Sequence, residues 1–241
     1  VMANRMVALL SKSFNLAELW NLRPDGTNPC LHIEKYPEKK RERYLTPDEL
    51  KRLGKALAEV EREQWSVPSI IPLVRLLVLT GCRLREIMLA RWEWVDFEAG
   101  TLTLPDSKTG AKIILLTPPA LAVLNAIERR EDNPYIIAGR KPGKHLVTPT
   151  TAWGHIRKRA SLPDLRMHDL RHTFGAAGAG SGLSLPIIGA LLHHKDSSST
   201  ARYSHVDQDP LRRAAETTAA ALDGWLNGKS GAEVVKLKRT Q

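Results

Sequence analysis

Apolar residues recur every three or four positions along most of this chain, which is the spacing of one face of a helix. Residues 46–49 read Thr-Pro-Asp-Glu, a capping box with proline in the first turn, and Gly81 and Gly182 end their segments. The pattern predicts helices over residues 3–22, 46–64, 69–80, 83–92, 117–130, 148–160, 168–180, 185–193, 200–205 and 209–227.

Two short β-prone runs interrupt this helical pattern. Residues 101–104 read Thr-Leu-Thr-Leu, residues 112–116 are mostly apolar, and Ser107-Lys108-Thr109-Gly110 lies between them. Two such runs around a glycine-containing turn predict a hairpin with Lys108 at or near its tip. The expected fold is therefore mainly α with a small antiparallel β-sheet.

The last predicted helix carries an apolar stripe on one face. Its members are Leu211, Ala214, Ala215, Thr218, Ala221, Leu222 and Trp225. Such a stripe indicates packing. It favours two interpretations equally, docking onto the core of the same chain or onto a neighbouring protomer.

Charge points to the class of partner. The 241 residues contain 36 Lys and Arg against 26 Asp and Glu, a net charge of +10, which suits a polyanion such as nucleic acid or an anionic membrane surface. No apolar run approaches the ~18–20 residues of a membrane span. The two cysteines form no CxxC pair and no signal peptide is recognisable, so a reducing, cytoplasmic setting is the default expectation.

Several residues fit the chemistry of phosphodiester cleavage. Negative charge grows on the non-bridging oxygens, where forked guanidinium groups such as Arg83 and Arg171 bind well. His168 and Arg171 lie three residues apart, on one helix face. Tyr203 is a candidate nucleophile, although forming its phenolate at pH 7 costs about 4 kcal/mol. Nearby cationic groups or a general base must supply that stabilisation, and His194 lies near Tyr203 in sequence.

Each of these residues has a plainer interpretation when taken alone. His168 and Arg171 could be a surface pair, and Lys108 a solvated lysine in a turn. Arg83 follows an apolar segment, so it needs a partner, and a salt bridge with Glu86 is expected beside any functional role. The argument therefore depends on the residues occurring together.

Taken in order, these motifs resemble those of tyrosine recombinases, and most closely the phage-type integrases of prophages and genomic islands. The matching segments are Thr80-Gly81-Cys82-Arg83-Leu84-Arg85-Glu86, the Ser-Lys-Thr-Gly segment around Lys108, Met167-His168-Asp169-Leu170-Arg171-His172-Thr173-Phe174, and Leu191-Leu192-His193-His194 with Tyr203 nine residues later. The resemblance covers about residues 44–207.

The resemblance implies roles for six residues. Arg83 and Arg171 would clamp the scissile phosphate, and His168 and His194 would hydrogen-bond it. Lys108 would protonate the leaving 5′-oxygen, and Tyr203 would form a 3′-phosphotyrosyl link without metal, cofactor or ATP. The implied partners are double-stranded DNA at attachment sites, a homotetramer on that DNA, and accessory DNA-bending or directionality proteins. The expected location is the nucleoid, with no membrane.

The resemblance also predicts a domain organisation. Residues 1–22 would be the last helix of a truncated core-binding domain, 23–43 a linker, 44–207 the catalytic domain, and 208–241 a C-terminal helix and tail that could be exchanged between protomers. One departure concerns His193, where the family usually has the glycine that suits a left-handed helix end. We expect backbone strain or another cap there.

Two alternatives stay open from the sequence. The chain could be a catalytically silent DNA-binding module. It could also be a metal-dependent hydrolase, since His168 and His172 have the spacing of zinc-binding helices, although Asp169 stands where a glutamate is typical. The basic run Arg157, Lys158 and Arg159 is expected to contact duplex phosphates, with a solvated helix face as the plainer interpretation.

Overall fold

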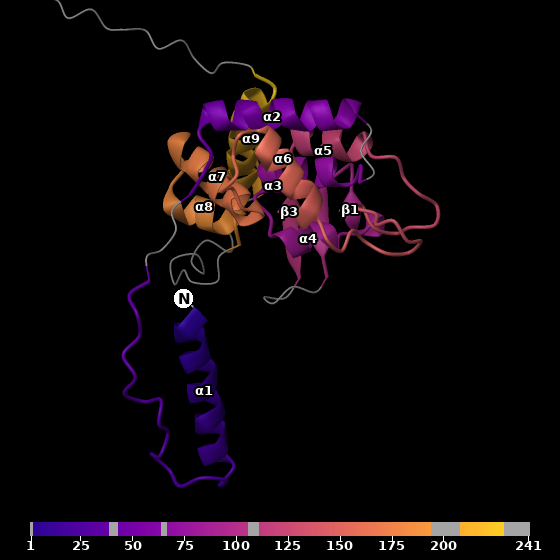
Figure 1. The fold of residues 1–241 in the computed structure, drawn as a ribbon. Coiled ribbons are helices and arrows are strands. Elements are labelled where there is room, and N and C mark those ends of the chain that lie inside the picture. Colours follow the sequence, from indigo (N-terminus) through magenta and orange to yellow (C-terminus); the bar gives the residue numbers. More distant parts are fainter. Residues whose placement is uncertain (1, 39–42, 64–66, 106–110, 194–207, 229–241) are drawn as a thin grey trace, which may run out of the picture. The chain divides into compact units, whose positions relative to one another are not determined.

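The chain divides into two compact units. The computed structural model describes residues 2–38, 43–63, 67–105, 111–193 and 208–228. Contacts within the chain separate Val1–Glu42 from Arg43–Gln241. Figure 1 shows the elements of each unit. No helix among the described residues is both long and apolar enough to cross a membrane.

The smaller unit is one helix with an extended segment that returns along it. Helix α1 spans Met2–Leu19, close to the predicted 3–22, and buries none of its residues. Asn4 exchanges two hydrogen bonds with the backbone of Tyr36, at 2.8 and 2.9 Å. Asn28 donates to the Asn15 side chain at 2.6 Å. Hydrogen bonds of asparagine side chains therefore hold the returning segment against the helix.

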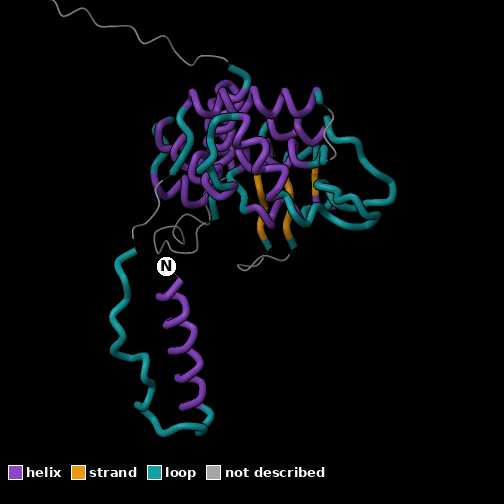
Figure 2. Tube along the Cα trace, viewed as in Figure 1, coloured by secondary structure: helices purple, strands orange, loops and turns teal. Residues whose placement is uncertain are grey.

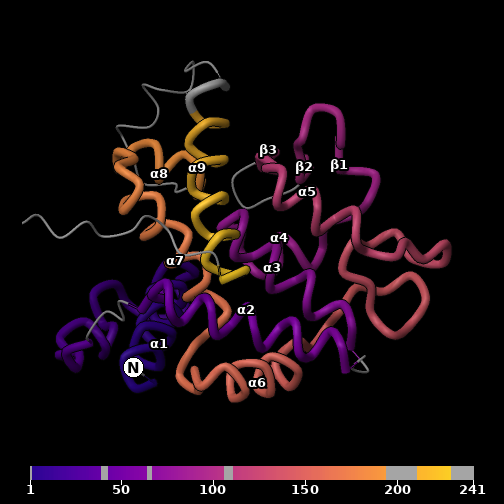
Figure 3. The backbone as a smooth tube through the Cα atoms, turned by 90° about the horizontal axis from the view of Figure 1, so that it is seen from above, coloured from indigo at the N-terminus to yellow at the C-terminus, as the bar shows by residue number. Residues whose placement is uncertain are grey.

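Helix α3 (Ile70–Thr80) forms the centre of the larger unit. It is apolar except for Arg75, which pairs with Glu61, and it is buried along most of its length. Such a helix must be surrounded by other elements. Helices α5 (Pro118–Asn125), α7 (Met167–Gly180) and α9 (Gln208–Leu226) pack around it. Seen from above in Figure 3, α9 lies beside α7 and α8.

Helix α2 (Pro47–Arg62) begins with the predicted capping box. The Thr46 hydroxyl accepts from the Glu49 N–H at 3.3 Å, and the Glu49 carboxylate accepts from the Thr46 N–H at 3.0 Å. Two backbone donors of the first turn are thereby satisfied. In Figure 1, α2 runs across the side of the unit opposite to the strands and α4.

The sheet is antiparallel with the order β1-β2-β3 (Figure 2). The predicted hairpin is confirmed by β2 (Thr101–Leu104) and β3 (Lys112–Leu115), paired through Leu102 and Ile114. A third strand, β1 (Val95–Asp96), was not expected, because two residues carry no detectable period. The fold class predicted from the sequence, mainly α with a small antiparallel sheet, is confirmed.

Some predicted helices are shorter in the structure. Helix α4 covers only Leu84–Met88, and the 3₁₀ turn η1 covers Trp92–Trp94. The Trp92 N–H donates to Pro134 O, and the Ile136 N–H donates to Ala90 O, both at 3.0 Å. Pairing with this distant segment draws residues 90–92 out of the helix.

The remaining helices follow the prediction closely. Helix α6 spans Thr150–Arg159 and α8 spans Leu185–Leu191. Helix α5 is the exception, because it ends at Asn125 rather than near Arg130. After its end, the Arg129 guanidinium stacks over the ring of Trp92, 4.4 Å from the ring centroid. The predicted helix over 200–205 lies outside the described residues.

Helix α9 buries its apolar stripe within this chain. Ala214, Ala215 and Leu222 of the stripe are buried, and the helix packs on α2 and α7. This arrangement agrees with docking onto the chain's own core, and exchange between protomers stays a prediction. Gly54 permits the close contact, because a Cβ there would lie 1.9 Å from the carbonyl oxygen of Leu226.

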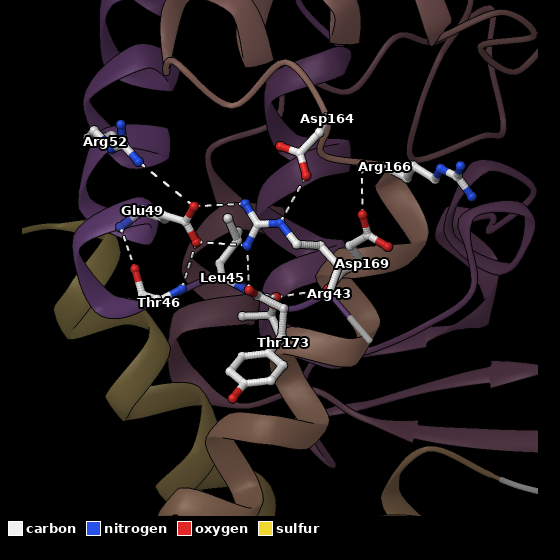
Figure 4. A network of polar contacts seen from close by, with 10 residues as sticks. Arg43, Leu45, Thr46, Glu49, Arg52, Asp164, Arg166, Asp169 and Thr173 are labelled. Atoms are coloured by element: carbon white, nitrogen blue, oxygen red, sulfur yellow. Dashed lines mark hydrogen bonds and ion pairs between the residues drawn. The ribbon is translucent and has the colours of Figure 1, made fainter. Parts of the chain in front are cut away.

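The chain enters the larger unit through a polar network (Figure 4). The Arg43 guanidinium donates to both carboxylate oxygens of Glu49, at 2.7 and 2.8 Å, and to Asp164 at 3.2 Å. The Leu45 N–H donates to the buried Thr173 hydroxyl at 3.0 Å. Because Thr173 belongs to α7, the entry segment is bonded directly to that helix.

Replacing Gly54 with alanine tests the packing of α9. The added methyl group should force the two helices apart and destabilise the protein by about 1–3 kcal/mol, lowering the thermal midpoint by several degrees. Gly154→Ala in α6 is the matched control, since a Cβ there meets nothing within 4 Å. It should leave stability unchanged or raise it. Equal midpoints for the two variants would contradict the packing described.

Candidate active site

Arg171 is a buried cation held by two backbone carbonyls. Its guanidinium donates to Gly81 O at 2.7 Å and also to Leu192 O, and only 4% of the residue is exposed. Gly81 caps the end of α3 and Leu192 caps the end of α8. The C-terminal end of a helix carries a partial negative charge, so a cation between two such ends is stabilised.

Gly81 fits this arrangement by its backbone and its lack of a side chain. Its φ is +63°, in the left-handed region that glycine adopts freely. A Cβ there would lie 2.7 Å from the ring of Phe174 and 2.8 Å from the Leu192 side chain. This turn leads into Arg83, whose charge acts on Arg171 and lowers its pKa after burial.

Arg83 shares one carboxylate with a buried lysine. Glu86 accepts from Arg83 Nη1 at 3.0 Å and from Lys112 Nζ at 2.8 Å. The Arg83 side chain is 46% exposed, whereas that of Lys112 is 3% exposed. The salt bridge expected between Arg83 and Glu86 is confirmed, and it leaves much of the Arg83 guanidinium open to a ligand.

His168 adds an accessible imidazole at the start of α7. Its ring packs edge-to-face against His172, with centroids 5.0 Å apart. Partial burial, followed by His172 and Arg171, lowers the pKa of His168, and Arg83 acts in the same direction. The imidazole is therefore close enough to both arginines to respond to their charge.

His193 follows the end of α8 in a left-handed conformation, with φ +49°. Burial, and then the charge of Lys112, lowers its pKa to about 4. The ring is consequently neutral at pH 7. The strained helix end expected from the sequence is present at this position.

The described side chains together carry an excess of positive charge. Arg83 and Lys112 share the carboxylate of Glu86, while burial and the charge of Arg83 lower the pKa of Arg171. The imidazoles of His168 and His193 add hydrogen-bond donors, and in the neutral form they add no charge. Such a cluster is suited to binding an anion, which would relieve the mutual repulsion of the cations.

The structure brings together three of the six predicted catalytic residues, Arg83, His168 and Arg171. Lys108, His194 and Tyr203 lie outside the described residues, so their positions stay predictions.

Lys112 was missed as a member of the site. The signal was available, because the alternation along β3 places this lysine on the buried face with Ile114. A charged residue at an inward position requires a partner.

The predicted DNA-binding run on α6 has mixed surroundings. Arg157 donates to Leu165 O at 3.1 Å, and Arg159 pairs with Glu63 at 2.7 Å. Lys158 is exposed. Contact of these residues with a duplex stays a prediction, which Lys158 suits best.

No cluster of three or more potential metal ligands occurs within the residues that the structure describes. The rings of His168 and His172 pack edge-to-face against each other.

Comparison with known proteins gives consistent matches. The sequence model of the phage integrase family matches residues 43–209. Tyrosine recombinase XerA of Pyrococcus furiosus is 30% identical over 202 residues, covering 78% of this chain and 70% of that protein. Prophage integrase IntF of Escherichia coli is 26% identical over 164 residues, covering 66% of this chain but only 34% of that protein.

Solved structures share the fold. A lambda integrase bound to DNA superposes with a TM-score of 0.59 at 21% identity, covering 81% of this chain and 71% of that one. The integrase from mycobacterium phage Brujita gives a TM-score of 0.56 at 20% identity, covering 90% of this chain and 75% of that one. The larger unit thus has the fold of a tyrosine recombinase catalytic domain.

Glu86→Gln should be strongly destabilising at neutral pH, by about 3–5 kcal/mol, because it leaves the buried Lys112 without a counter-charge. Although burial alone would raise the pKa of Glu86, the hydrogen bond from Lys112 and the Arg83 backbone bring it below the ordinary value of 4.5. The stabilisation from ionised Glu86 is therefore full above that value and is lost as pH falls through the lower folded-state pKa.

Urea unfolding of both proteins across acidic pH checks this. The stability difference between wild type and Glu86→Gln should shrink as the pH falls below about 4.5. The double variant Glu86→Gln with Lys112→Met should recover much of the loss. A pH-independent difference would be inconsistent with the buried pair.

Proposed function

The chain belongs to the phage integrase family of tyrosine recombinases, and we propose that it performs site-specific DNA recombination, integrating or excising a mobile element. The observation that carries the proposal is the surplus of cations around Glu86, with Arg171 anchored and Arg83 accessible. One backbone phosphate of a duplex supplies the anion that this cluster lacks.

The proposed reaction uses the chain's own side chains. Arg83 and Arg171 hold the scissile phosphate, and His168 and His194 hydrogen-bond its non-bridging oxygens. The phenol oxygen of Tyr203 attacks phosphorus, and its proton passes to a base, for which His168 is best suited.

Bond exchange at phosphorus then balances without an external reagent. The bond from phosphorus to the 5′-oxygen breaks as Lys108 protonates that oxygen, leaving a 3′-phosphotyrosyl link. A 5′-hydroxyl from a partner duplex attacks the link, restores the phosphodiester and releases Tyr203. The bond energy is kept in the covalent intermediate.

Strand exchange requires more than one active site on the DNA. Structures of lambda integrase include a dimer bound to a core site and a tetramer bound to a Holliday junction. We propose that this chain likewise acts on attachment-site duplexes as a homotetramer, with accessory DNA-bending or directionality proteins as further partners. The tail after α9 is a candidate for exchange between protomers.

Tyr203→Phe should abolish the covalent intermediate without abolishing DNA binding. A nicked suicide duplex that loses its 5′-hydroxyl fragment should trap wild-type protein as an adduct resistant to denaturant. The variant should retain duplex affinity, with the same salt dependence. An adduct formed by the variant would show that another residue is the nucleophile, and binding without any wild-type adduct would favour a silent DNA-binding module.

The two arginines should respond differently to replacement by lysine. Arg171→Lys should lower the thermal midpoint by at least about 4 °C, because an ammonium group cannot span the two helix-end carbonyls. Arg83→Lys should leave the midpoint nearly unchanged, since the side chain is largely accessible, yet reduce adduct formation by about 100-fold. Equal midpoints for both variants would contradict the distinct roles.

A further inference from the structure

His193 has an uncommon backbone for its residue type. Among the described residues, only Asn21, Ser161 and His193 combine a positive φ with a side chain. Asn21 and Ser161 are exposed in turns that follow α1 and α6. His193 instead adjoins the candidate active site, where glycine would serve the backbone without strain. A strained residue at such a place points to a use for its side chain.

The peptide group before His193 is fixed on both sides. Its carbonyl, that of Leu192, accepts from Arg171, and its N–H donates to Ala190 O at 3.0 Å. The left-handed backbone therefore sets the direction of the imidazole relative to the Arg171 guanidinium. The backbone that carries the ring is therefore held by the same contacts that hold Arg171.

The imidazole borders a cavity of about 170 Å³ between β3, α7, α8 and α9. The other walls are largely apolar, among them Ile114, Phe174 and Leu211. In the part of the chain that the structure describes, neither ring nitrogen has a hydrogen-bond partner. An imidazole that has no hydrogen-bond partner within the described residues can offer its N–H to a ligand or to solvent.

The charged groups that act on His193 are those of the candidate site. Lys112 has the largest effect after burial, followed by Glu86, Arg171 and Arg83. A protonated ring would add repulsion among these cations, whereas the neutral ring still offers one N–H donor. The neutral His193 imidazole thus supplies a hydrogen-bond donor that carries no charge.

We propose that His193 is a further catalytic residue, which donates a hydrogen bond to a non-bridging oxygen of the phosphate held by Arg83 and Arg171. The proposal rests on the recombinase function proposed above. It assigns to His193 a contact additional to those of His168 and His194. The strained backbone at residue 193 is the structural consequence of keeping a side chain where glycine would be easier to accommodate.

His193→Gly separates a catalytic from a purely structural role. The variant removes the donor while relieving the left-handed strain, so its thermal midpoint should stay within about 2–4 °C of wild type. Single-turnover cleavage of a suicide duplex should slow by about 100-fold. Cleavage at the wild-type rate would overturn the proposal.

His193→Asn provides the matched rescue. Asparagine tolerates a positive φ and keeps an N–H donor, so it should cleave at least about tenfold faster than His193→Gly. Equal rates for the two variants would count against a donor role. If the glycine variant folds poorly, the rate of each variant is normalised to its folded fraction before the comparison.

A modified substrate locates the contact. In a methylphosphonate duplex, a methyl group replaces one non-bridging oxygen at the scissile position, and the two stereoisomers remove different oxygens. The penalty of His193→Gly should disappear for one isomer and persist for the other. An equal penalty for both isomers would overturn the assignment.

The two proposals fail in different ways. Wild-type protein that forms no adduct would refute recombinase chemistry itself. Adduct formation at equal rates by wild type and His193→Gly would refute only the role of His193.

Discussion

The larger unit is organised around one buried guanidinium. A charge that leaves water must be hydrogen-bonded, and the ends of two helices supply carbonyls for Arg171 that no helix uses internally. Satisfying Arg171 draws together α7, Gly81 and Leu192, segments far apart in sequence. Gly81 and Leu192 also precede Arg83 and His193 closely in the sequence. The geometry of the site therefore follows from a requirement of stability.

The candidate site carries more positive than negative charge, which does not favour stability. Glu86 neutralises part of the charge of Arg83 and Lys112, and within the described residues the hydrogen bonds of the Arg171 guanidinium go to neutral carbonyls. Repulsion among these cations lowers the stability of the unliganded protein. A bound phosphate would offset that repulsion, so the arrangement of charges is more stable with an anion bound than without one.

Local chemistry explains why part of this structure was predictable. The capping box at Thr46, the glycine stop at Gly81 and the paired β-prone runs each act within a few residues, and each was recovered. The shortened helix α4 was not, because its end is set by Trp92 bonding to Pro134, forty-two residues away. Distance along the chain, rather than weak local propensity, limits such predictions.

The candidate site also contains features that local sequence predicts and features that depend on distant segments. The spacing of His168 and Arg171 on a single helix was enough to place them together. The role of Lys112 was missed because its partner Glu86 lies on a different element, and the carbonyls that hold Arg171 carry no signal in the side-chain sequence. Backbone acceptors of this kind become visible only with the fold.

The polar network at Arg43 bears on how the larger unit could be excised as a working fragment. The sequence pattern starts the catalytic domain at residue 44 and assigns Arg43 to the linker. A fragment that began at residue 44 would lose the guanidinium that binds Glu49 and Asp164. A fragment of the larger unit should therefore include Arg43, because its side chain holds the first turn of α2.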